Sequence, residues 1–152
     1  MTALDDSSPS GVVAFSEVQR VLGLFADGLV GEAMQLESVE DERVGWPWDA
    51  SLPTGTVIRL PAAIAESASS RENRGAYRAA VLHRIGFAQF GGQAFAADEL
   101  EQVVAASSRP ILMRDVFALF ENLRIDAATQ QAYPGARTDL DRVRAAARAH
   151  RS

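Results

Sequence analysis

The chain has 152 residues, of which 47% are hydrophobic and 23% charged, with a formal net charge of −5 and no cysteine. This is the composition of one soluble globular domain, and it excludes disulfides, thiol catalysis and thiolate metal sites. The acidic balance argues against general nucleic-acid binding, and no apolar run reaches the roughly 20 residues of a membrane-spanning helix.

The first third of the chain predicts a lead, a helix and a loop. Residues 1–11 are polar, without the basic and apolar regions of a signal peptide, so we expect a disordered lead and a cytoplasmic protein. A single domain is expected over residues 12–152. Apolar residues recur at helical spacing from Phe15 to Leu29, with Ser16 as a cap, and Leu36 extends the same face. An acidic cluster over residues 37–42 and a loop with Trp46 and Trp48 come next.

The remaining residues predict one short strand and four helices. The strand lies near residues 56–60, and the helices cover 73–90, 98–106, 110–133 and 138–150. Gly91 ends the first of these helices, Pro110 stands in the first turn of the third, and Pro134-Gly135 ends it. The sequence therefore predicts an all-α domain of about five to six helices, with at most one short strand.

His83 is the residue with the clearest chemical potential. The zinc-protease pattern H-E-x-x-H places two histidines one helical turn apart, with a glutamate as general base. Here Arg84 stands in place of the base and Phe87 in place of the second histidine. We therefore expect a structural or hydrogen-bonded His83, no catalytic residue and no cofactor. A degenerate zincin-like site for a divalent metal at His83, Glu121 and Asp126 is the alternative.

The helix that contains Glu121 and Arg124 is expected to pack against the helix of His83. Residues three apart lie on one helix face, so Glu121 and Arg124 can pair, either in solvent or as part of a polar patch facing His83. The two helices are expected to meet through Val81, Ile85, Phe117 and Phe120.

Three segments, in order and spacing, resemble the N-terminal region of the nitric oxide reductase activation protein NorD family, which includes the Rubisco-activation protein CbbO. They are LPAAIAES, ENRGAYRAAVLHRIGFAQFGG and FENLRIDAATQQAYPGARTDLDRV, and they cover about residues 57–143. Arg84, Gly92 and Asn122 depart from the family pattern. The residues that carry the resemblance include Leu60, Pro61, Asn73, Tyr77, His83, Gly86, Phe90, Gly91, Glu121, Arg124, Ile125, Asp126, Tyr133, Pro134, Gly135, Arg137, Asp139 and Leu140.

The resemblance implies a non-enzymatic adaptor that works with a MoxR-type AAA+ ATPase to activate a metalloenzyme such as nitric oxide reductase or Rubisco. In the family this region precedes a von Willebrand A domain, which the present sequence lacks, so such a domain is expected from a second protein. No nucleic-acid binding and no membrane insertion are expected. A helical interaction domain with an unrelated partner is the remaining alternative.

Two surfaces are candidates for partner binding. The loop of Trp46 and Trp48 offers large aromatic side chains, which are frequent interface anchors; the alternative is that both cap the core. The segment from Arg137 to the end is rich in arginine. We expect this segment to dock the von Willebrand A domain and to be removable without unfolding the other helices.

Overall fold

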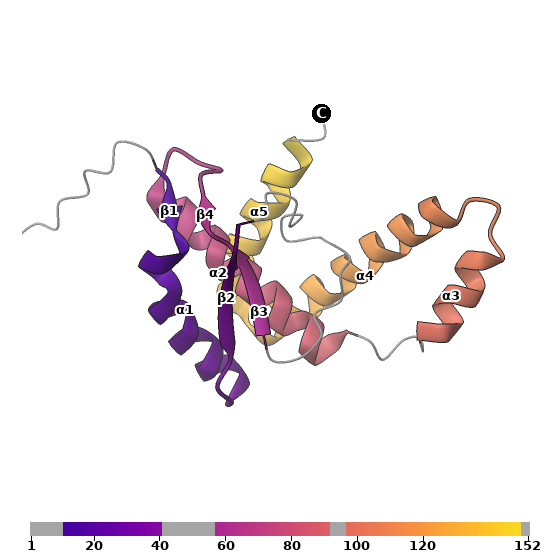
Figure 1. The fold of residues 1–152 in the computed structure, drawn as a ribbon, viewed down its shortest axis with the longest axis horizontal. Helices are drawn as coiled ribbons and strands as arrows, with labels where there is room; N and C mark the ends of the chain where they lie inside the picture. Colours follow the sequence, from indigo (N-terminus) through magenta and orange to yellow (C-terminus); the bar gives the residue numbers. More distant parts are fainter. Residues whose placement is uncertain (1–10, 41–56, 92–96, 150–152) are drawn as a thin grey trace, which may run out of the picture.

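The computed structural model describes residues 11–40, 57–91 and 97–149. The mainly α-helical class is confirmed, whereas the expectation of at most one strand is wrong, because the described residues contain four short strands (Figure 1). In chain order the elements are β1 (Val13–Ala14), α1 (Phe15–Val30), β2 (Gln35–Val39), β3 (Val57–Pro61), β4 (Ala63–Ile64), α2 (Ser70–Phe90), α3 (Ala97–Ala105), α4 (Pro110–Ala132), the 3-10 turn η1 (Pro134–Ala136) and α5 (Arg137–Ala149).

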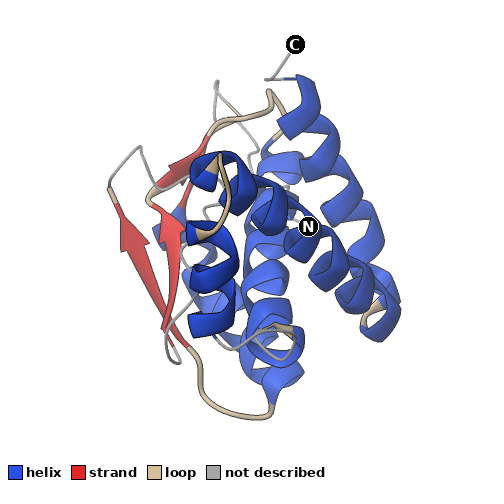
Figure 2. Cartoon of the chain, turned by 90° about the vertical axis from the view of Figure 1, so that its right-hand side faces the viewer, coloured by secondary structure: helices blue, strands red, loops and turns tan. Residues whose placement is uncertain are grey.

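The strands form two small pairs. β1 pairs with β4 in an antiparallel arrangement, and β2 pairs with β3 in a parallel one, with Leu36 opposite Ile58. Figure 2 shows the strands along one side of the helical body. Pairs this short bury apolar residues only by packing on the helices, so they depend on the helical core.

The prediction that Leu36 extends the first helix is wrong. α1 ends at Val30 because Gly31 adopts the left-handed conformation, with φ of 77°, and its N–H donates to the carbonyl of Asp27 at 2.8 Å. The carboxylate of Asp27 then accepts the N–H of Met34 at 2.8 Å. The chain is thereby turned back, and Leu36 is buried from a strand. The helix also begins one residue before Ser16, and the N–H of Ala14 is bound by Glu17 instead.

Helix α2 is the centre of the core. It contacts α1 and three of the strands as well as α4 and α5. It carries buried residues on several sides, many of them small: Ala76, Ala79, Ala80 and Gly86. Small residues let neighbouring helices approach closely, so α2 is surrounded by other elements instead of presenting a single buried face.

α2 and α4 pack against each other, as predicted, and the expected residues Val81 and Ile85 of α2 are buried, whereas Phe120 of α4 is not. The buried residues of α4 are Asn122, Ile125, Asp126 and Thr129, all in its C-terminal half. Phe120 is 65% exposed. The N-terminal half of α4 leaves the body together with α3, and the two form a projecting arm, residues 97–124 (Figure 1).

Several expectations fall on residues outside the described ranges. These are the lead at residues 1–10, the loop of Trp46 and Trp48, and the second half of the acidic cluster, Asp41 and Glu42. Among the described helices, none is both long and apolar enough to cross a membrane.

Candidate functional site

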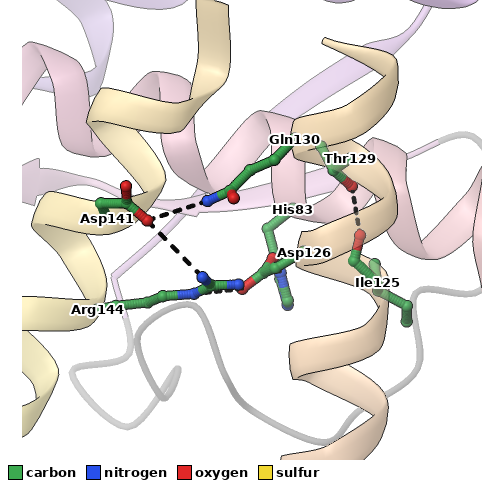
Figure 3. A network of polar contacts seen from close by, with 7 residues as sticks. All are labelled: His83, Ile125, Asp126, Thr129, Gln130, Asp141 and Arg144. Atoms are coloured by element: carbon green, nitrogen blue, oxygen red, sulfur yellow. Dashed lines mark hydrogen bonds and ion pairs between the residues drawn. The ribbon is translucent and has the colours of Figure 1, made fainter. Parts of the chain in front are cut away.

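Three helices meet at a charged network in the interior. Nδ1 of His83 on α2 lies 2.8 Å from Oδ1 of Asp126 on α4. Arg144 on α5 donates to Oδ2 of the same carboxylate, from Nε at 3.1 Å and from Nη2 at 2.9 Å (Figure 3). The side chain of Asp126 is fully buried and that of His83 nearly so. One carboxylate thus joins α2, α4 and α5, and we call these three residues the His–Asp–Arg network.

The local sequence explains why the network can form. At the α2–α4 crossing, a Cβ on Gly86 would overlap Oγ1 of Thr129 and would lie 3.1 Å from Cγ2 of Ile125. The Thr129 hydroxyl donates to the carbonyl of Ile125 at 2.8 Å. Gly86 has no side chain, and the Thr129 hydroxyl makes its hydrogen bond within its own helix. The two helices can therefore approach closely, which brings Asp126 within reach of His83.

The network fixes the orientation of the imidazole. One oxygen of Asp126 faces Nδ1 of His83, and the other faces the guanidinium of Arg144. The ring also meets the ring of Phe87 edge-on, at 5.1 Å between centroids. A histidine held by a carboxylate occurs in catalytic and metal sites, but in those sites the imidazole must also reach a substrate or an ion. His83 is 1% exposed.

Two of the three proposed metal ligands, His83 and Asp126, meet, but they bind each other. Both oxygens of Asp126 are bound by His83 and Arg144. Glu121 is bound by Arg124, at 2.8 Å from Nε and 2.6 Å from Nη2. Among the described residues, no group of three or more histidine, aspartate or glutamate side chains is placed to hold a metal ion.

Arg124 has a structural partner beyond Glu121. Its Nη2 donates to the carbonyl of Phe90 at 2.6 Å, at the end of α2. Hydrogen bonding to Glu121 raises the pKa of Arg124 above its usual value. The pair therefore satisfies a carbonyl in the last turn of α2 and ties that end of the helix to α4.

Tyr77 and Asn73 hold backbone segments on the other side of α2. The Tyr77 hydroxyl donates to the carbonyl of Pro61 at 2.9 Å. The amide of Asn73 binds the backbone of Gly11 and Ser67. Both side chains lie inside the body and bind strand or loop carbonyls, so they position the β-strands on α2.

The pattern residues between α4 and α5 lie at or near the surface. The Tyr133 hydroxyl donates to Oε1 of Gln89 at 2.9 Å. Pro134 opens η1 directly after α4, so Pro134-Gly135 ends that helix as predicted. Gly135 and Arg137 are exposed.

Sequence reasoning missed two arginines that bind α5 to the body. Arg144 was expected to be one of several surface arginines, but it enters the His–Asp–Arg network. Arg78 on α2 binds both carboxylate oxygens of Asp139, at 2.9 and 3.2 Å. A sequence signal for Arg144 exists: it follows Val143 and lies one turn after Leu140, and both of these are buried.

A hollow lies elsewhere, between α1 and β2. Its volume is about 560 Å³, and none of its lining residues belongs to the His–Asp–Arg network. It is lined by Phe15, Ser16, Gln19, Leu36, Glu37, Ser38 and Ala62.

Comparison with models of known protein families, with characterised proteins and with solved structures finds no significant match. The resemblance to the NorD family therefore stands on the sequence pattern alone.

Proposed function

We propose that this chain is a non-enzymatic adaptor domain that acts in metalloenzyme activation, together with a MoxR-type AAA+ ATPase and a von Willebrand A domain protein. One observation carries the proposal. The polar groups of the sequence pattern are bound to one another or to the backbone: His83 and Asp126 inside the fold, and Arg124 at its surface. Side chains used in this way hold helices together, which supports a scaffold that acts through its surface.

The sequence resemblance suggests a von Willebrand A domain protein as partner. The distribution of charge supports α5 as the surface that binds it. Arg137, Arg142 and Arg148 are exposed on α5, in a chain of net charge −5. Arg142 lies 3.9 Å from Glu72 and 3.8 Å from Asp139, at the long end of ion pairing, so a partner carboxylate can compete for it. We propose that this α5 surface meets an acidic patch of the von Willebrand A protein.

A binding experiment with a charge reversal tests this proposal. The chain should bind the von Willebrand A protein encoded beside it, alone or with the MoxR-type ATPase, and binding should weaken with added salt because exposed charges are screened within about 8–10 Å. Arg137→Glu should reduce the affinity roughly 5- to 10-fold, mainly through the association rate. Surface plasmon resonance at two salt concentrations measures both effects.

Arg20→Glu is the matched control, because Arg20 is an exposed arginine on α1, away from α5. It should bind as the unmodified chain does. If both variants lose affinity equally, the loss is due to the change in net charge and not to the α5 surface. If the unmodified chain binds neither partner, the adaptor function is contradicted.

The competing proposal, a degenerate metallopeptidase-like site, makes a different prediction. It requires stoichiometric zinc or iron that is lost in His83→Ala, measured by elemental analysis of the purified chain. The adaptor proposal expects far less than one metal ion per chain.

A further inference from the structure

The projecting arm carries an apolar stripe along α4. Leu112, Val116, Leu119 and Leu123 follow one another at intervals of four, three and four residues. This is the a/d spacing of a coiled-coil seam, which keeps the side chains on one line along a helix. They are 51%, 39%, 48% and 42% exposed, and Met113 and Phe120 beside them are 38% and 65% exposed.

The stripe faces away from the contacts that α4 makes within the chain. α3 packs on another side of α4, where Val104 is buried and Arg114 pairs with Glu101 at 2.7 Å. α2 meets α4 further along, through Asn122 and Ile125. At 100° per residue, Arg114 and Ile125 lie on the side of α4 opposite the line of Val116 and Leu123, whereas Asn122 lies about 100° from Leu123.

The exposed apolar area is of the size that a stable interface uses. Taking roughly 200 Å² for a fully exposed large apolar side chain, the six stripe and flanking residues together expose on the order of 570 Å². The largest apolar patch on a typical monomer is about 300–600 Å², and each partner of a standard interface buries about 800 Å², of which somewhat more than half is apolar.

The residues beside the stripe fit a second copy of the same helix. In an antiparallel pair, like flanking positions of the heptad face one another. On one side these positions are Met113 and Phe120, which are apolar; on the other, Asp115 is exposed and Asn122 is uncharged and already buried against the body. No like charges are therefore brought together across the pair, and residues 110–124 carry two arginines and two acidic residues.

The shape of the molecule selects the antiparallel direction. The body lies at the C-terminal end of α4, and the arm extends from it (Figure 1). Parallel pairing would bring the two bodies together at one end, whereas antiparallel pairing places them at opposite ends of the paired helices. A two-fold axis is also the commonest symmetry of homo-oligomers.

We propose that the chain forms a homodimer through this stripe, with the two α4 helices antiparallel. Leu112 of one copy lies opposite Leu123 of the other, and Val116 lies opposite Leu119. The two α3–α4 arms together then form a four-helix bundle between the two bodies. This surface is distinct from the α5 surface, so either proposal can fail without the other.

The oligomeric state of the full chain tests the dimer. Light scattering after gel filtration should give twice the mass of one chain, and Leu119→Glu should give a monomer with unchanged helical content, because Leu119 contributes to the stripe and not to the core. Val21→Glu is the matched control: Val21 is 68% exposed on α1, and this variant should stay dimeric. A monomeric unmodified chain, or a Leu119→Glu variant that remains a dimer, would overturn the proposal.

Disulfide cross-linking tests whether the two α4 helices are antiparallel. The chain has no cysteine of its own, so only the introduced cysteines can form a disulfide. Under oxidation, a mixture of Leu112→Cys and Leu123→Cys chains should form disulfide-linked dimers, while Leu112→Cys alone should not. Linkage of Leu112→Cys chains to one another would indicate parallel pairing and refute the proposed geometry.

Discussion

At the scale of the residue, the polar groups inside this core are used to hold backbone and helices in place. Asn73 and Tyr77 bind carbonyls of segments far away in sequence, and His83 binds a carboxylate on another helix. A buried polar group is destabilising unless it finds such a partner, commonly by about 1–3 kcal/mol. The same residue types that suggest chemistry in a sequence can therefore be needed for folding alone, and only the partners distinguish the two roles.

Tyr77 predicts a loss of stability at alkaline pH. Burial, with a further effect from the charge of Glu17, raises the pKa of Tyr77 from 10.0 to about 12. Between these values the folded chain keeps a proton that the unfolded chain releases. The stabilising contribution is therefore complete below pH 10 and is lost as the pH rises toward 12, by up to about 3 kcal/mol.

The composition makes this prediction testable. The 15 basic residues are all arginine, so no lysine titrates in this range and arginine stays charged. Urea unfolding measured from pH 9 to 12 should show the free energy of unfolding falling with pH. In Tyr77→Phe the fall should be smaller, although this variant loses about 1 kcal/mol at neutral pH with its hydrogen bond. An equal slope in the two proteins would contradict the assignment.

At the scale of the element, helices with strong end signals were predictable and the strands were not. The expected range 110–133 compares with Pro110–Ala132 in the structure, and 73–90 with Ser70–Phe90. Proline at the start and proline-glycine at the end act locally, so sequence alone defines them. β1 and β4 have two residues each and pair across some fifty residues of chain, and no local pattern marks such strands.

A glycine-to-alanine substitution should have opposite effects on stability at the α2–α4 crossing and on the open surface of α1. Gly86→Ala should destabilise the fold by about 1–3 kcal/mol, because the new methyl group overlaps Thr129 and crowds Ile125. Gly23→Ala on α1 meets no atom within 4 Å and should stabilise it by about 0.5–1 kcal/mol through helix propensity. Denaturant midpoints of the two variants measure both effects, and destabilisation by both would contradict the role of the crossing.

At the scale of the whole molecule, α5 packs into the core, which argues against the expectation that this helix can be removed without unfolding the others. Leu140 and Val143 are buried against the body, and Arg144 reaches Asp126. From the sequence, Arg144 could not be told apart from the surface arginines of α5. Its partner, Asp126, lies on another helix, 18 residues earlier. The polar face of a short helix can be predicted from its sequence. That Arg144 points into the body depends on how α2, α4 and α5 pack together.

Removing residues 137–152 should therefore abolish cooperative folding. The deletion loses two buried apolar side chains, each contributing about 1.5–3 kcal/mol, and leaves the carboxylate of Asp126 buried without its arginine. A domain of this size has about 5–15 kcal/mol of stability in total, so the remaining chain should give a broad thermal transition by circular dichroism.

Arg144→Ala alone should cost about 3–5 kcal/mol and keep a sharp transition at a lower temperature. Arg137→Ala, which changes an exposed arginine of the same helix, should stay within about 0.5 kcal/mol of the unmodified chain. A deletion variant that melts as sharply and at the same temperature as the full chain would show that α5 is an appendage, and the His–Asp–Arg network would lose its structural role.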